Sequence, residues 1–236
     1  MKKLIIGATG SIGSAVSRNI HKNGGKTHLV GRNEEELSSL AEELDSSYTV
    51  ADVLDENFCN HIINDLGEED IDGLAFCVGS IDLKPLKLTK KSDYMQCFNL
   101  NLISATEIIR ACHEKLKKNK GSIVLFSTVA ARKGFINHSI ISSAKSAVEG
   151  LTVALAAEFA PNVRVNCIAP SLSKSKMATP MLKNEKMADS IAKMHALKRI
   201  GDGEDFSSLV NFLLSKNSSW ITGQIIGVDG GRSSVA

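Results

Sequence analysis

A glycine-rich run near the start of the chain has a spacing suited to binding phosphate. The run, Gly7-Ala8-Thr9-Gly10-Ser11-Ile12-Gly13, follows the short apolar stretch Lys3 to Ile6 and precedes the apolar pattern of a helix. Such a turn lets the backbone approach a pyrophosphate, whose charge is stabilised by free N–H groups and the dipole at the helix N-terminus. An ordinary tight turn is the alternative. The strand and helix around the run favour a dinucleotide site formed by Gly7, Thr9, Gly10, Ser11, Ile12 and Gly13.

The end of the second apolar run indicates which dinucleotide this site prefers. An NAD-specific site normally has an acid here, which accepts a hydrogen bond from the ribose 2′-hydroxyl, but this position holds Gly31. The next residue, Arg32, offers a planar cation that suits a 2′-phosphate. The alternative is a solvated surface arginine. We therefore expect NADP(H) as the preferred cofactor, with NAD(H) possible.

These candidate residues need a scaffold, and seven short apolar runs alternate with longer helical patterns along the chain. The runs are apolar continuously rather than at every second residue, as expected of parallel strands covered on both faces. They predict a single-domain, Rossmann-type doubly wound α/β fold over residues 1–236, with about seven parallel strands flanked by helices. The predicted strands are Lys3 to Ile6, Thr27 to Val30, Tyr48 to Val50, Gly73 to Val78, Ser122 to Phe126, Arg164 to Ile168 and Gln224 to Val228.

Two further segments are interpretable from their composition. Asn33 with Glu36 three residues later resembles a capping box for a helix ending near Leu44, whose apolar stripe is Leu37, Leu40, Ala41 and Leu44. The stretch from Ser171 to Met194 is rich in Ser, Lys and Met and interrupts the alternation of strands and helices. We expect a lid-like insertion at about residues 171–195, acting as a mobile flap over the site.

The composition excludes several classes of protein. A chain of 236 residues with 43% hydrophobic and 23% charged residues can bury a sizeable core, and the net charge of +2 shows no basic stripe for nucleic acid. The five cysteines form no C-x-x-C pair, so a reducing, cytoplasmic location is expected. We predict no signal peptide, no membrane span and no metal site.

Two late stretches resemble the short-chain dehydrogenase/reductase family, and the likeness extends over essentially the whole chain. Asn162 to Pro170 is similar to the family's sixth-strand signature, and Trp220 to Gly231 resembles its seventh strand and C-terminal turn. The resemblance implies that Pro170, Ser171 and Ser175 contact the cofactor. Ser171 stands in place of the usual glycine. Ser175 stands where a threonine normally contacts the nicotinamide carboxamide or a phosphate.

The same resemblance implies roles for earlier positions. Asp52 and Val53 are similar to the family's adenine contact, and Gly79 is the one glycine kept from its Asn-Asn-Ala-Gly turn, which here reads Cys77-Val78-Gly79. Asn101 occupies the place of the structural and catalytic asparagine. Thr128, next to Ser127, takes the place of the substrate-orienting serine. Threonine keeps a hydroxyl, although either hydroxyl could instead close a strand-end turn.

The most consequential departure from the family concerns its general acid. The family places a tyrosine four residues before a lysine on one helix face, so that the ammonium lowers the phenol's pKa. Here Lys145 follows Ile141, which has no proton to give. His138 would lie on the same helical stripe and titrates near neutrality, so it is a candidate surrogate. The alternative for His138 is a helix-entry residue bonded to backbone, and Lys145 retains a cofactor-binding role in either case.

Two functions follow from these residues. The first is an NADP(H)-dependent oxidoreductase acting on a carbonyl, an alcohol or an activated alkene, with Asn101, Thr128, Lys145 and His138 as candidate catalytic residues and a small molecule as substrate. The second is a catalytically silent dinucleotide-binding sensor or scaffold, favoured by Ile141. The family resemblance also implies a homodimer or homotetramer. Small and apolar residues from Ala144 to Ala157 suit that assembly.

Overall fold

The computed structural model describes residues 1–235 and contains one seven-stranded parallel sheet. The strand order is β3-β2-β1-β4-β5-β6-β7, so the chain reverses direction across the sheet between β1 and β4. This confirms the predicted doubly wound fold, and each observed strand overlaps a predicted run. The strands are β1 Lys2–Ile6, β2 Lys26–Gly31, β3 Ser47–Val50, β4 Ile71–Phe76, β5 Ser122–Phe126, β6 Arg164–Pro170 and β7 Ile225–Val228.

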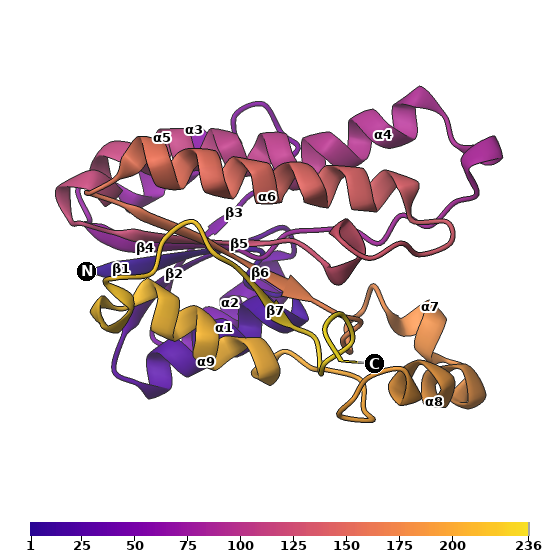
Figure 1. The fold of residues 1–236 in the computed structure, drawn as a ribbon. Helices are drawn as coiled ribbons and strands as arrows, with labels where there is room; N and C mark the ends of the chain where they lie inside the picture. Colours follow the sequence, from indigo (N-terminus) through magenta and orange to yellow (C-terminus); the bar gives the residue numbers. More distant parts are fainter. Residues whose placement is uncertain (236) are drawn as a thin grey trace.

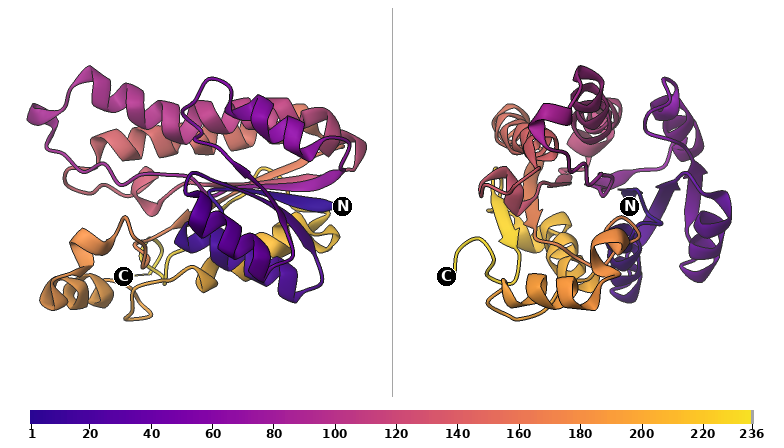
Figure 2. Two further views of the ribbon diagram at one scale, coloured as in Figure 1. Left: turned by 180° about the vertical axis from the view of Figure 1, so that it is seen from behind. Right: turned by 90° about the vertical axis from the view of Figure 1, so that its right-hand side faces the viewer.

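Helices cover both faces of the sheet, giving three layers (Figures 1 and 2). On one face lie α1 (Ser11–Lys22), α2 (Glu34–Glu43) and α9 (Glu204–Leu214). On the other lie α3 (Phe58–Leu66), α4 (Lys91–Phe98), α5 (Ser104–Lys118) and α6 (Ser139–Phe159). A π-helical turn, Asn99–Ile103, joins α4 to α5, and a short 3₁₀ turn, Val129–Ala131, follows β5.

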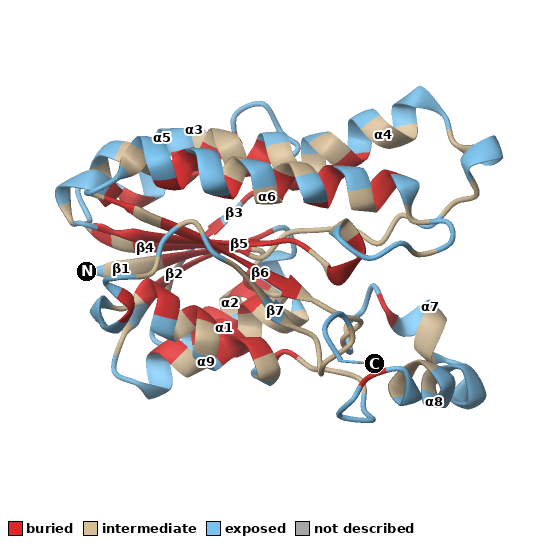
Figure 3. Cartoon of the chain, viewed as in Figure 1, coloured by how far each residue is buried: buried red, intermediate tan, exposed pale blue. Residues whose placement is uncertain are grey.

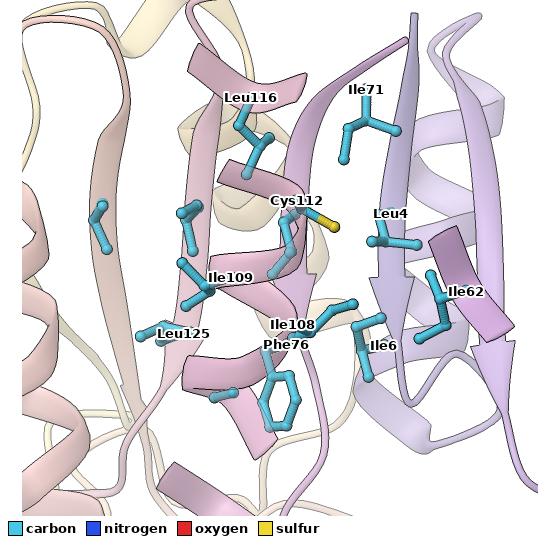
Figure 4. Packing of buried hydrophobic residues seen from close by; sticks show 14 of the residues in the cluster. Leu4, Ile6, Ile62, Ile71, Phe76, Ile108, Ile109, Cys112, Leu116 and Leu125 are labelled. Carbon is cyan, nitrogen blue, oxygen red and sulfur yellow. The ribbon is translucent and has the colours of Figure 1, made fainter. Parts of the chain in front are cut away.

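Most residues of the five central strands are buried, as expected of parallel strands covered by helices on both faces, whereas the edge strands β3 and β7 are more exposed (Figure 3). Along β1 the side chains alternate: Leu4 and Ile6 pack beneath α3 and α5 with Phe76, as Figure 4 shows, whereas Ile5 joins the opposite cluster. The second cluster includes Phe206 from α9. Two apolar layers therefore hold the carboxyl ends of the strands in fixed positions.

The helix predicted after Asn33 is confirmed. Asn33 caps α2, since its side chain accepts a hydrogen bond from the Glu36 N–H at 3.1 Å, and the predicted stripe through Leu37 is buried. The carboxylate of Glu36 does not complete the capping box. It forms an ion pair with Lys176 instead.

The segment expected to be a flap contains two short helices, α7 (Thr179–Leu182) and α8 (Glu185–Lys193). Both lie at the end of the molecule where the strands terminate (Figure 1). Before α7 the chain pairs with the loop leading to α9, through a bridge between Ser173 and Gly201. The insertion is therefore partly helical and attached to the body at its base.

Helix α6 has 21 residues and a mean hydropathy of 1.3 in its most apolar window, so by length and composition alone it could cross a membrane. Its buried residues, however, include Val148 and Leu155, which belong to the core between α6 and the sheet. The helix begins at Ser139 and His138 is its N-cap, which agrees with the helix-entry alternative for His138 rather than with a place inside the helical stripe.

Candidate functional site

The turn between β1 and α1 depends on glycine at two positions. Gly7 adopts φ +79°, and a Cβ there would lie 3.0 Å from Val78 and 3.1 Å from the backbone of Cys77. At Gly13 a Cβ would lie 2.2 Å from the Gly7 carbonyl oxygen. Any side chain at Gly13 must therefore displace backbone, which keeps the turn tight and the start of α1 close to β1.

The N-terminus of α1 offers donors to an anion. Gly10 is the N-cap and has no side chain, so no cap covers the N–H groups of Ser11, Ile12 and Gly13. Thr9 lies next to Gly31, where an added Cβ would be 3.4 Å from its hydroxyl oxygen. Free backbone donors and the helix dipole fit a dinucleotide pyrophosphate. All six residues predicted for this turn thus lie together at the carboxyl end of β1.

Late segments of the chain complete the surroundings of this turn. The Ser11 hydroxyl donates to the Lys174 carbonyl oxygen at 2.8 Å, which attaches the base of the insertion to the turn. Gly203, just before α9, lies against the same residue: a Cβ there would be 2.2 Å from the Ser11 carbonyl oxygen. The turn is therefore enclosed by residues more than 160 positions away in sequence.

Arg32 and Asp52 lie together where β2 and β3 end. Arg32 Nη1 is 3.2 Å from Asp52 Oδ2, and the arginine side chain is 72% exposed. Asp52 also accepts a hydrogen bond from the Leu54 N–H at 3.0 Å, while neighbouring Val53 is buried. A pair this exposed contributes little to stability. The guanidinium can therefore turn toward a bound phosphate at small cost.

Asn101 and Lys145 face each other across Gly79. A Cβ on Gly79 would lie 3.3 Å from both Asn101 Oδ1 and Lys145 Nζ. Asn101 is 1% exposed, and its Oδ1 has no hydrogen-bond partner among residues 1–235. A buried acceptor left without a partner is costly, so such atoms usually bind water or ligand. Asn101 Oδ1 and Lys145 Nζ therefore both border Gly79, and we call this pair of buried polar groups beside the dinucleotide turn the Gly79 site.

Lys145 is buried and carries a perturbed charge. Its Nζ donates to the Phe126 carbonyl oxygen at 2.9 Å, which leaves two ammonium protons for other partners. Burial lowers the pKa of Lys145 to about 8, an effect that the thiols of Cys167, Cys97 and Cys77 partly oppose. A lysine with a pKa near neutrality can both give and take a proton.

The two hydroxyls after β5 have different partners. Thr128 caps the 3₁₀ turn, its Oγ1 accepting from the Ala130 N–H at 3.3 Å. The Ser127 hydroxyl donates to Glu149 Oε1 at 2.9 Å and to the Lys145 carbonyl oxygen at 3.2 Å. Ser127 is thus occupied in holding α6. Thr128 keeps its own proton for a further partner.

Ile141 and His138 differ in surroundings from Lys145. Ile141 is 5% exposed and packs in an apolar cluster with Cys97, Ile140 and Ala144. His138 Nδ1 donates to the Ile136 carbonyl oxygen at 2.7 Å, and the ring lines a separate cavity of about 350 Å³. Its neighbours there do not include Asn101 or Lys145.

The hydroxyls predicted in the insertion make contacts within it. Ser175 Oγ accepts from the Ala178 N–H at 3.1 Å. Ser171, which follows Pro170 at the end of β6, bonds to His195 Nε2 at 2.8 Å. His195 is 2% exposed, and its Nδ1 donates to the Ile191 carbonyl oxygen at 2.9 Å, so neutral His195 accepts the Ser171 proton.

Sequence reasoning missed three residues near the site, namely His195, Ser80 and Asp82. The hydroxyl of Ser80, directly after Gly79, donates to Asp82. No motif signals any of them: His195 and Asn101 reach their partners Ser171 and Ser80 from 24 and 21 positions away, and the Ser80–Asp82 contact, though local, belongs to no recognised motif. The loop position of Ser80, next to a predicted site glycine, was the one available clue.

The fold and this site define a Rossmann-type protein that binds a dinucleotide at the point where the strand order reverses. Residues 7–233 match the family model described as enoyl-(acyl carrier protein) reductase. A tropinone reductase homolog from Arabidopsis thaliana is 34% identical, over 97% of this chain and 90% of its own length. The 3-oxoacyl-[acyl-carrier-protein] reductase FabG of Rickettsia prowazekii is 33% identical, over 97% of this chain and 95% of its own length.

Solved structures point to the same family as these relatives. A short chain dehydrogenase/reductase family protein superimposes with a TM-score of 0.91 at 27% identity, covering 100% of this chain and 98% of its own. ElxO with NADP bound gives 0.90 at 29% identity, covering 99% and 100%. The chain belongs to the short-chain dehydrogenase/reductase family, a family of NAD(P)-dependent oxidoreductases.

Proposed function

We propose that the protein is an NADP(H)-dependent reductase of a small-molecule carbonyl, or in the reverse direction an alcohol dehydrogenase; an activated alkene is a further possible substrate class. The observation that carries the proposal is the Gly79 site. There Asn101 Oδ1, which has no partner among residues 1–235, and the buried Lys145 ammonium both border Gly79, beside the anion-binding turn. Both relatives described above are named as reductases or a homolog of one. When bound, the cofactor would supply the hydride.

The residues of this chain would provide binding and a proton. Backbone N–H groups at the start of α1 would hold the pyrophosphate, and Pro170, Ser171 and Ser175, at the end of β6 and the base of the insertion, would contact the cofactor. Thr128 would orient the substrate oxygen through its free proton. With Ile141 unable to donate, Lys145 is our proposed proton source, because two of its ammonium protons remain available. His138 is less suitable, because its Nδ1 proton is bonded to backbone in another cavity.

Arg32 supports NADP(H) over NAD(H). It follows Gly31, which has no carboxylate for a ribose hydroxyl, and it is exposed where the 2′-phosphate would lie. Replacing Arg32→Ala should weaken NADPH binding about tenfold, as expected for losing a hydrogen bond to a charged group, and leave NADH binding unchanged. Fluorescence titration with both nucleotides measures this difference. Equal losses for both nucleotides would argue against a 2′-phosphate contact.

The silent sensor or scaffold remains the second candidate, because Ile141 lies in an apolar cluster at the position expected for the acid. Titration with NADPH, followed by a panel of carbonyl substrates, separates the two functions. Turnover supports the reductase, and tight binding without turnover supports the sensor. In Ile141→Tyr, activity arising from none would identify a silent parent, whereas loss of an existing activity would show that another acid already acts there.

A homo-oligomer is also part of the proposal. The face of α6 opposite the sheet exposes Val153, Ala154 and Ala157, which are small or apolar and suit close packing against a second copy. Size-exclusion chromatography with light scattering tests it. The five cysteines are all free thiols, consistent with a proposed cytoplasmic location.

A further inference from the structure

The side-chain amide nitrogen of Asn101 contacts Cys97 and the hydroxyl of Ser80. Its Nδ2 is 2.9 Å from the Cys97 carbonyl oxygen, which can only accept. It is also 3.4 Å from Ser80 Oγ. A hydroxyl can donate or accept, so the Ser80 contact alone does not set the direction of the amide.

Asp82 determines the role of that hydroxyl. Ser80 has one proton, and it is donated to Asp82 Oδ2, since a carboxylate can only accept. Ser80 Oγ therefore presents lone pairs to Asn101, and it joins the Cys97 carbonyl oxygen and Cys97 Sγ, which is 3.4 Å from Nδ2, on the donor side of the amide. The amide oxygen must then point the other way, toward Gly79 and Lys145 Nζ, where it has no partner among residues 1–235.

We propose that Ser80 and Asp82 are positioning residues, which hold the Asn101 amide so that its oxygen faces Lys145 across Gly79. Their contribution to turnover rests on the proposed reductase function, whereas the orientation of the amide does not. An amide turned the other way would direct a donor at the Lys145 ammonium, which itself only donates. That arrangement would turn the acceptor Asn101 Oδ1 away from Gly79 and Lys145.

The surroundings of Asp82 supply a matched control. Ser80 and Asp82 line a cavity of about 300 Å³ that also contains a second carboxylate, Asp93. Asp93 accepts from Lys84 Nζ and from the Lys90 N–H, both at 2.8 Å. Replacing Asp93→Asn removes one charge from the same cavity without changing the contacts of Ser80.

Orientation is measured first, without turnover. In the cofactor-free protein, NOEs from the Asn101 side-chain amide protons should reach Ser80 and Cys97 in the parent and in Asp93→Asn. In Asp82→Ala the freed Ser80 proton competes for the amide oxygen against the Cys97 carbonyl, which still binds Nδ2, so NOEs to Gly79 Hα should appear beside the remaining NOEs to Cys97. Asp82→Asn retains an acceptor oxygen and should restore the parent pattern. An unchanged pattern in Asp82→Ala would overturn the proposal.

Binding and turnover are measured second. Asp82→Ala should lower kcat/KM for NADPH-dependent reduction about tenfold, the effect of losing one charged hydrogen bond, with Asp82→Asn and Asp93→Asn within about twofold of the parent. If Asp82→Ala does not fold, Ser80→Ala removes the acceptor directly and should shift the NOEs in the same direction. Equal losses in Asp82→Ala and Asp93→Asn would also overturn the proposal. A parent without turnover refutes only the reductase, because the NOEs still report the amide.

Discussion

The two halves of the site are built by different means. In the dinucleotide half, formed by β1, α1 and β2, the binding surface is backbone, and its shape follows from glycines with no room for a Cβ. In the catalytic half, formed by the π-helical turn, β5 and α6, the surface consists of side chains such as Asn101 and Lys145. Backbone geometry tolerates few substitutions, whereas a side chain can be exchanged without changing the fold. Ile141, where the family resemblance implies a tyrosine, lies within an unbroken α6.

The largest expected effect tests whether the dinucleotide half really depends on backbone. In Gly13→Ala, a Cβ 2.2 Å from the Gly7 carbonyl oxygen must displace the turn. We expect a loss of about 3 kcal/mol in the free energy of unfolding, and NADPH binding weakened at least about 100-fold, which is roughly 3 kcal/mol. Urea unfolding and NADPH titration measure both.

Gly150→Ala is the matched control for that change. Gly150 is also a helical glycine, but a Cβ there would meet nothing within 4 Å. It should stabilise the protein by up to about 1 kcal/mol through helix propensity and leave binding unaltered. If Gly13→Ala resembled Gly150→Ala, the contrast between the two halves would be lost.

The next prediction concerns the free energy of unfolding in acid, which should depend on a buried histidine of β2, a strand of the dinucleotide half. His28 on β2 is fully buried, with its ring nitrogens 2.8 Å from Ser47 Oγ and 2.9 Å from Thr49 Oγ1. Burial lowers the pKa of His28 to about 4, and nearby Lys2 adds to the decrease. Because the pKa in the folded protein is below the unfolded value of about 6.5, the stabilisation is complete above that pH and is lost as the pH falls toward 4.

Urea unfolding at pH 7 and pH 4.5 measures this contribution. The parent should lose about 2 to 3 kcal/mol more than His28→Asn between these two pH values. Although the substitution has its own cost at pH 7, the comparison uses the change with pH in each protein. Parallel losses would show that other groups control acid unfolding.

The smallest expected effect belongs to the catalytic half. If Lys145 donates the proton in carbonyl reduction, kcat should fall about tenfold per pH unit as the pH rises above 8, where the lysine, with a pKa of about 8, becomes a neutral amine. Alcohol oxidation should show the opposite slope. Steady-state rates from pH 6.5 to 9, with NADPH affinity measured at each pH, test this fall of about tenfold. A flat profile would exclude Lys145 as the donor.

The same contrast explains which features could be predicted from sequence. The strands, the Asn33 cap and the residues of the glycine-rich turn were predictable because each depends on local periodicity or on backbone that only glycine can adopt. The roles implied for Asn101, Thr128 and Lys145 came from resemblance and remain proposals.

Pairings between distant side chains could not be predicted. Arg32 and Asp52 were each singled out, but not their contact, and nothing indicated the Ser171–His195 bond or the contact of Ser80 with Asn101. The displacement of His138 from α6 also depended on where the preceding loop ends, and a helix boundary is uncertain by a few residues from sequence alone.

The contact of Gly203 with Ser11 has a consequence for biosynthesis. The pyrophosphate turn is encoded in the first 13 residues, yet part of its enclosure is synthesised about 190 residues later, with the loop before α9. While the chain is still on the ribosome, the nascent turn lacks the wall that Gly203 and Lys174 provide. Capture of the nucleotide thus becomes a late event, and an interrupted translation product would carry the motif without a finished pocket.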